Sequence, residues 1–185
     1  MNSADPSSER QTLTLQEALG LGLHHHTAGD LTKAESIYQQ ILQTHPNQPD
    51  ALHLLGVISY QTGKYDIAVD LINDVLAVKS DFAEAHNNLG NVLKELRRPD
   101  EAIVSYHKAI DINPGYAEAH SNLGILLKKL GRMGEAVASY HKAIQIKPNY
   151  TTAHNNLGNA LKEVGQFDEA VASYHKAIDI KPNYA

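Results

Sequence analysis

Residues 83–116 read AEAHNNLGNVLKELRRPDEAIVSYHKAIDINPGY, and most of the chain repeats this stretch. Residues 151–184, two periods of 34 residues further on, are identical to it at 23 of 34 positions. Residues 117–150 fit the same frame, and two diverged copies fit residues 15–48 and 49–82. A fixed period of this length indicates a repeat protein, so the sequence predicts five repeats over residues 15–184.

Each copy carries two helical patterns separated by a short break. In residues 83–116 apolar and small side chains recur every three or four positions, first around Leu89 and Gly90 and then around Ala102 and Tyr106. This spacing predicts two amphipathic helices of about 14 residues in each repeat. Two helices this short cannot bury a core alone, so the hairpins must stack on their neighbours. We therefore expect an all-α solenoid of ten helices.

The order of small and aromatic residues within a copy resembles the tetratricopeptide repeat (TPR). Its elements are Leu-Gly in the first helix, a later Ala, an aromatic residue, another Ala and a closing Pro, here Leu89-Gly90, Ala102, Tyr106, Ala109 and Pro114. The resemblance covers about 170 of the 185 residues. It implies a right-handed α-solenoid whose first helices line a concave groove.

The third copy departs from this pattern at its break. Arg97, Arg98 and Pro99 stand where a glycine and an aromatic residue are usual. A residue with a side chain costs roughly 1 kcal/mol in the left-handed conformation that caps such a helix. We therefore expect a slightly altered turn there.

The two ends of the chain differ from the repeats between them. Residues 1–14 are polar and Ser-rich, which predicts a disordered leader, and the spacing of Thr14 and Glu17 predicts a capping box that starts the first helix. Tyr184 and Ala185 match Tyr116 and Ala117, where the next repeat begins, and the sequence given has no polar capping helix after the fifth repeat. We expect a fragment, or a C-terminally truncated product, in which another copy associates with the uncapped last repeat around Val171, Tyr174 and Ile178.

Composition restricts the class of protein. The net charge of -5 and the absence of a basic tract argue against nucleic-acid binding and against an anionic membrane surface. The chain has no cysteine, which excludes disulfides and Cys-ligated zinc. It has no signal-peptide pattern and no long apolar run, so a cytoplasmic location is expected.

The polar face of the first helices carries the candidate binding residues. An extended peptide advances about 3.3 Å per residue, so side chains on helices roughly 8–10 Å apart would meet it at every third residue. An Asn amide offers a donor and an acceptor, which match those of a peptide unit. The predicted peptide-binding residues are Asn87, Asn88, Asn91, Lys94, Asn122, Lys128, Asn155, Asn156, Asn159 and Lys162. The lysines would add a mild preference for acidic ligands, whereas a purely solvated polar face is the alternative.

The sequence motif Ala-His-Asn-Asn-Leu-Gly-Asn is similar to that of the TPR arm of O-GlcNAc transferases, whose inner asparagines hold substrate peptides. That resemblance implies a ladder of Asn88, Asn122 and Asn156, which ends where the second repeat has Leu54. The TPRs that clamp the carboxylate tails of chaperones match less well, because Thr152 and Asn156 stand where they have a lysine and an arginine.

Catalytic and metal sites are not expected. His86, His120 and His154 recur with the period, as do His107, His141 and His175, so each set is spread along the stack while zinc ligands must lie about 2.1 Å from one ion. Consecutive side chains such as those of residues 24–26, or of the repeated Ser-Tyr-His-Lys, diverge by about 100° on a helix. We expect no cofactor and no metal, with adventitious nickel binding at residues 24–26.

Two functions follow from these expectations. The favoured one is a non-catalytic scaffold that binds a protein or peptide segment in its concave groove. The alternative is the N-terminal substrate-recognition arm of a larger glycosyltransferase.

Overall fold

The computed structural model describes residues 13–183, which form ten α-helices and no strand. The predicted leader lies outside the described residues except for its last two positions. The helices are α1 Leu15–Thr27, α2 Leu31–Thr44, α3 Pro49–Gln61, α4 Tyr65–Val78, α5 Ala83–Glu95, α6 Pro99–Ile112, α7 Ala117–Lys129, α8 Met133–Ile146, α9 Thr151–Glu163 and α10 Phe167–Ile180. No helix among them is long and apolar enough to cross a membrane.

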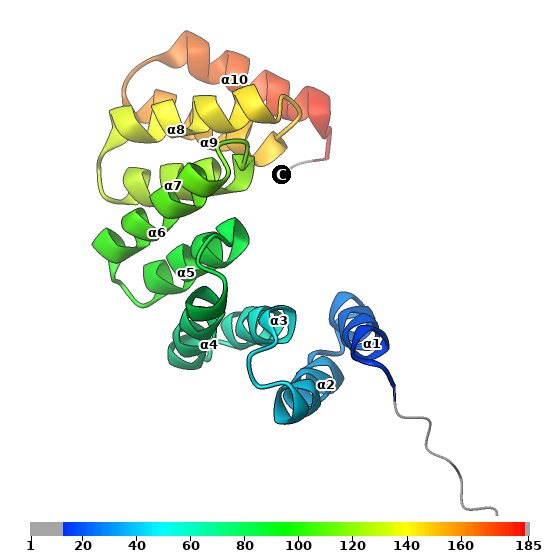
Figure 1. The fold of residues 1–185 in the computed structure, drawn as a ribbon. Helices are drawn as coiled ribbons and strands as arrows, with labels where there is room; N and C mark the ends of the chain where they lie inside the picture. The colour runs from blue at the N-terminus through cyan, green and yellow to red at the C-terminus, as the bar shows by residue number, and fades with distance from the viewer. Residues whose placement is uncertain (1–12, 184–185) are drawn as a thin grey trace, which may run out of the picture.

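Consecutive helices pair into five antiparallel hairpins that stack into one curved array, so the predicted all-α solenoid is confirmed (Figure 1). Neighbouring odd-numbered helices from α3 to α9 also contact one another directly, and no pair of even-numbered helices does so to a similar extent in the described residues. From α3 to α9 the odd-numbered helices are therefore closer together than the even-numbered ones. They line the inner, concave side of the curve.

The first helix begins as the sequence predicts. The backbone N–H of Glu17 donates to Thr14 Oγ1 at 3.3 Å, and the backbone N–H of Thr14 donates to a Glu17 carboxylate oxygen at 2.8 Å. These reciprocal bonds form a capping box, which satisfies two N–H groups that the helix cannot pair itself.

The turn inside each of the five hairpins contains one residue in the left-handed backbone conformation, with a positive φ. Four of them use Gly29, Gly63, Gly131 and Gly165 with φ between 75° and 82°, and the third hairpin uses Arg97 with φ 58°. The next residue, Arg98, donates its N–H to Leu93 O at 2.9 Å, as Arg132 does to Leu127 O at 2.9 Å. The expectation of an altered turn was therefore wrong: the packing of the hairpin fixes the turn, and Arg97 adopts the conformation that glycine adopts elsewhere.

Arg97→Gly is expected to raise the free energy of unfolding by about 0.5–1 kcal/mol, because glycine carries no steric penalty at positive φ. Urea denaturation followed by circular dichroism measures the change. The matched control is Gly131→Arg, which places the same side chain in the equivalent turn and should destabilise by a similar amount. A stability loss in Arg97→Gly would show that the Arg97 side chain contributes more than its backbone costs.

Candidate binding surface on the inner helices

The structure places the predicted binding residues on α5, α7 and α9, which belong to the inner side of the solenoid. Asn87 is buried, with 4% of its surface exposed, and Lys162 is exposed. The remaining predicted residues are partly buried: Asn88, Asn91, Lys94, Asn122, Lys128, Asn155, Asn156 and Asn159. Their amides thus lie at the surface of the inner wall, apart from that of Asn87.

Four of the polar side chains on this wall form a continuous set of hydrogen bonds, which we call the amide chain. Asn88 Nδ2 donates to His53 Nε2 at 2.8 Å, which joins α5 to α3. Asn87 Nδ2 contacts Asn88 Oδ1 at 3.5 Å, and Asn122 Nδ2 donates to Asn87 Oδ1 at 3.0 Å, which joins α7 to α5. The amide chain therefore ties three consecutive hairpins together and fixes the orientation of Asn88 and Asn122.

His53 is a member of the amide chain that sequence reasoning missed. The prediction ended the ladder at Leu54, but the residue that bonds is its neighbour, one period of 34 before Asn87. The signal that could have identified it is this shared place in the repeat. Had the positions of Asn87 and Asn88 been treated as one row along the stack, His53 would have been included in it.

The amide chain ends at the fourth hairpin. Ser121 occupies the place of Asn87, and its shorter side chain leaves Oγ buried without a hydrogen-bond partner in the described residues. Asn156, which corresponds to Asn122, has no side-chain hydrogen bond within residues 13–183. Ser121, in place of an asparagine, thus separates a section of the wall whose asparagines are hydrogen-bonded to one another from a section where Asn155 and Asn156 make no side-chain hydrogen bond in the described residues. We call the latter the open section.

A second set of bonds ties the inner wall to the outer helices. Tyr106 Oη donates to Asn91 Oδ1 at 2.8 Å, and Tyr174 Oη donates to Asn159 Oδ1 at 2.9 Å. In the hairpin between them Ile125 replaces the asparagine, and the Tyr140 hydroxyl is buried without a partner. Burial raises the pKa of Tyr106 and of Tyr140, so both hydroxyls stay protonated, and that of Tyr106 donates to Asn91.

The lysines predicted to favour acidic ligands differ in whether they form ion pairs with neighbouring glutamates. Lys94 Nζ lies 3.4 Å from a Glu95 carboxylate oxygen, and Lys128 Nζ lies 2.8 Å from that of Glu163. Lys162 is exposed and makes no ion pair in the described part of the chain. The lysine row is therefore largely neutralised by neighbouring glutamates.

Two pockets adjoin the wall near the C-terminal end of α7. One, of about 390 Å³, is lined by Ile125, Lys128, Lys129, Tyr140, Asn156 and Glu163. The other, also about 390 Å³, is lined by Lys94, Arg97, Pro99, Leu126, Lys129 and Leu130. Lys129 belongs to both, so the pockets are neighbours. Three of the lining residues in the second pocket are cationic, and none is acidic.

The two periodic histidine rows lie in different surroundings. His86 Nε2 donates to Ser80 O at 3.0 Å and His154 Nε2 to Pro148 O at 2.9 Å, and both rings are buried. The corresponding contact of His120 with Pro114 O is longer, at 3.4 Å, and this ring is partly exposed. The outer row is exposed and comprises His107, His141 and His175. The first row therefore fastens α5, α7 and α9 each to the loop before it.

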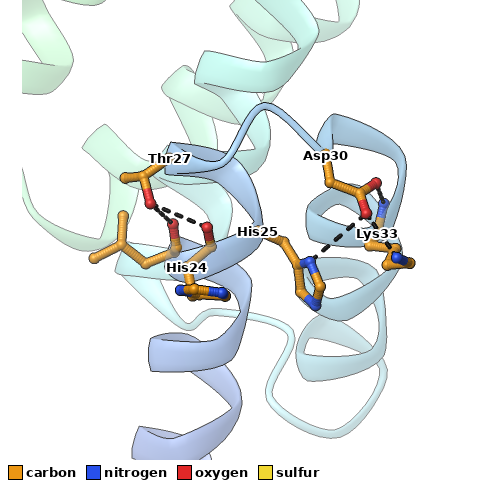
Figure 2. Close-up of polar contacts among 6 residues, drawn as sticks. His24, His25, Thr27, Asp30 and Lys33 are labelled. Carbon is orange, nitrogen blue, oxygen red and sulfur yellow. Dashed lines mark hydrogen bonds and ion pairs between the residues drawn. The ribbon is translucent and has the colours of Figure 1, made fainter.

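The histidine cluster at the end of α1 is spread over different partners. Figure 2 shows His25 directed toward Asp30, with Nδ1 3.7 Å from a carboxylate oxygen that also pairs with Lys33 at 2.8 Å. His26 Nε2 instead donates to Gln61 Oε1 at 2.9 Å. Within residues 13–183 no three His, Asp or Glu side chains are placed to hold one metal ion.

Acidification is expected to weaken the amide chain at His53. Burial lowers the pKa of His53 from its usual value near 6.5, and the charges of Glu84 and Asp50 only partly oppose this shift. The unfolded chain therefore binds this proton at a higher pH than the folded chain. Stability should fall as the pH drops below about 6.5 and level off below the folded pKa. Protonation at Nε2 would also remove the acceptor that Asn88 uses.

Thermal midpoints at pH 7.5 and 5.5 measure this effect, and His53→Gln is the matched variant because its carboxamide does not titrate. The variant should lose less of its thermal stability on acidification than the unmodified chain. Equal losses would mean that His53 does not contribute. Burial also lowers the pKa of His120, so a smaller dependence should remain in the variant.

Comparison with known proteins identifies the repeats. Models described as tetratricopeptide repeat match residues 25–92, 83–116, 105–138 and 151–184, and one described as TPR repeat matches residues 126–165. Together they span residues 25–184 without a gap. No curated protein matches the sequence significantly.

Solved structures share the fold along most of its length. The crystal structure of MamA superposes with a TM-score of 0.76 at 29% identity, over 88% of this chain and 95% of MamA. YrrB, described as a TPR protein with an unusual peptide-binding site, gives 0.68 at 22% identity, over 91% and 87%. The pilF protein of Pseudomonas aeruginosa gives 0.83 at 21% identity, over 89% and 75%. The last two similarities concern the fold alone.

Proposed function

The chain belongs to the tetratricopeptide repeat family, and from that premise we propose that it is a non-catalytic scaffold binding an extended peptide segment of a partner protein. The segment lies along the inner wall formed by α5, α7 and α9. TPR domains typically bind proteins or peptides, which gives the general role, while the groove and its residues are our proposal.

The amide chain is the observation that carries this proposal. Its bonds hold Asn88 and Asn122 in fixed orientations across neighbouring hairpins before any ligand arrives. A carboxamide has two N–H donors and two acceptor lone pairs, so each of these side chains keeps unused capacity toward the groove. Fixed polar groups lose little conformational entropy on binding, which favours recognition of a peptide backbone.

The open section of the wall adds free groups to these fixed ones. Asn155 and Asn156 make no side-chain hydrogen bond within the described residues and are partly exposed. Asn91 and Asn159 accept from tyrosine hydroxyls through Oδ1, which leaves their N–H groups for a ligand carbonyl. Amides along the wall can therefore pair with several peptide units of one extended segment.

Peptides selected from a random phage-displayed library against the chain provide the test. The combined variant Asn88→Ala, Asn122→Ala and Asn156→Ala should weaken their binding by about tenfold or more, because several hydrogen bonds worth about 1 kcal/mol each are lost. The matched control is His107→Ala, His141→Ala and His175→Ala, which alters three exposed side chains on the outer helices. Unchanged affinity in the asparagine variant would show that the groove assignment is wrong.

The alternative role as the arm of a larger glycosyltransferase rests on the sequence resemblance alone. Nothing in the geometry of the described residues favours it over a free scaffold. It remains a prediction about a longer protein.

We also propose that two copies associate through α10, tail to tail. Val171 and Ile178 are 52% and 50% exposed, whereas Val137 and Ile144 at the same places in α8 are partly buried. The outer face of α1 carries Glu17 and His24 where α9 has the buried Ala153 and Ala160. Leu21 on the same face of α1 is 40% exposed, at the place of the buried Leu157, so Glu17 and His24 make this face only partly polar. We expect the symmetric contact between two copies of α10, and sedimentation equilibrium at increasing concentration measures it.

A further inference from the structure

The outer helices α4 and α6 border a pocket on the side of the solenoid opposite the amide chain. Both helices pack on α5, but they do not pack on each other to a similar extent in the described residues. The pocket between them has a volume of about 460 Å³, and most of its lining comes from α4 and α6. Sites for small molecules and side chains typically measure about 300–1,000 Å³, so this pocket can hold a ligand group.

A buried histidine that lines this pocket has one unsatisfied ring nitrogen. His86, on α5, is 7% exposed. Its Nε2 lies 3.0 Å from Ser80 O, and because a carbonyl oxygen can only accept, the hydrogen of the neutral ring is on Nε2. Nδ1 is then an acceptor, and it is buried without a hydrogen-bond partner in the described residues. Native proteins seldom leave such an atom unsatisfied, so it marks a place for a donor from another molecule.

The remaining lining is apolar in part and bears two opposite charges. Leu76 and Leu89 are partly buried, and Ile112 is 39% exposed. Lys108 and Asp111 are exposed, and neither makes an ion pair in the part of the chain that the structure describes. Their charges cancel, so the pocket favours neither a cation nor an anion. It fits an apolar group that carries one neutral hydrogen-bond donor.

We propose that this pocket binds the indole ring of a tryptophan residue in a partner protein. The indole N–H only donates, which matches His86 Nδ1, whereas a phenol oxygen would also require a donor. The ring would pack on Leu76, Leu89 and Ile112. Tryptophan is enriched among the residues that anchor protein interfaces. The chain has no tryptophan of its own, so the ring comes from another molecule.

Two departures from the repeat distinguish this pocket from the next interface between outer helices. Asn73 and Ser80 line it, and one period of 34 later, between α6 and α8, His107 and Pro114 stand at the same places. Both replacements are larger side chains. The pocket between the second and third hairpins is therefore the more open of the two, and the sequence offers a natural way to fill it.

The fluorescence of N-acetyltryptophanamide, titrated with the chain, tests the site. Because the chain has no tryptophan, the indole emission comes from the probe alone. Its emission should shift to shorter wavelength on binding, with a Kd on the order of 1 mM for a single side chain. The analogue methylated at the indole nitrogen keeps the ring and loses the donor, and it should bind about five- to tenfold more weakly.

Asn73→His places in the pocket the side chain that the next interface carries, and it should weaken the probe about tenfold. The matched control is Gln39→His, which puts the same ring at the equivalent exposed place on α2 and should leave binding unchanged.

His86→Phe keeps a ring of similar size and removes the acceptor, and it should weaken the probe at least fivefold. It also removes the bond to Ser80, so His154→Phe, which removes the 2.9 Å bond to Pro148 O two hairpins away, is its matched control. The control should lower the melting temperature to a similar degree and bind the probe as the unmodified chain does.

Equal binding of the methylated analogue would overturn the proposal, as would unchanged affinity in both pocket variants or no emission shift at roughly ten times the expected Kd. Free tryptophan provides a further arm, and its binding more tightly than the blocked form would overturn the assignment to a residue of a partner protein. The peptide groove lies on the opposite side and is judged by the triple asparagine variant. Either proposal can therefore fail while the other stands.

Discussion

Gly124→Ala is expected to lower the free energy of unfolding by about 2 kcal/mol, because the added methyl group overpacks the core of the fourth hairpin. A Cβ at residue 124 would lie 2.7 Å from Cε1 and 2.9 Å from Cδ1 of Tyr140. The Tyr140 ring is completely buried, so it has no room to move away. The effect is net of the roughly 1 kcal/mol that alanine gains over glycine in a helix.

The second hairpin provides a control for this prediction. A Cβ at Gly56 would lie 3.2 Å from Ile72 Cγ1, because Ile72 stands where the other hairpins have tyrosine. Gly56→Ala should therefore be close to neutral in the same urea denaturation experiment. Equal destabilisation by both substitutions would mean that the contact with the tyrosine ring is not the cause.

Tyr106→Phe is expected to lower stability, whereas Tyr140→Phe is not. The first removes the hydrogen bond to Asn91 Oδ1 at 2.8 Å and should destabilise by about 1–1.5 kcal/mol. The second removes a buried hydroxyl that has no partner in the described residues, so it should be neutral or stabilise by up to about 1 kcal/mol. The difference between the two is the second large effect that the structure predicts.

Chemical denaturation of the two variants, measured side by side, gives this difference. Because both variants are Tyr→Phe, each loses the same oxygen atom and serves as the control for the other. A loss of stability in Tyr140→Phe that equals the loss in Tyr106→Phe would mean that the Tyr140 hydroxyl is already satisfied in the free chain.

The repeated sequence carried enough information to predict the architecture. Spacing of three and four positions depends only on local helix geometry, so the ten helices follow from residues such as Leu89 and Tyr106 without knowledge of their neighbours. The capping box at Thr14 is equally local and was predicted for the same reason. The turn at Arg97 was not, because the packing of the hairpin overrides the backbone preference of one residue.

The helices that carry the asparagine row were predictable from the sequence, but the contacts of the asparagine side chains were not. Period and polarity placed the asparagine row on the inner helices, where the structure has it. Sequence could not show that Asn87 is buried and already bonded to Asn122, or that His53 belongs to the same set. Such bonds join side chains about one repeat apart, and their lengths depend on how closely the inner helices approach.

The amino-acid sequence by itself determined that this chain is a stack of five helical hairpins with a polar row along the first helix of each. Only the tertiary structure decided which members of that row bond to one another and which remain open. The physical reason is that a hydrogen bond requires atoms within about 3 Å, so exchanging Asn for Ser at residue 121, or for Ile at residue 125, changes the partners without changing the helices.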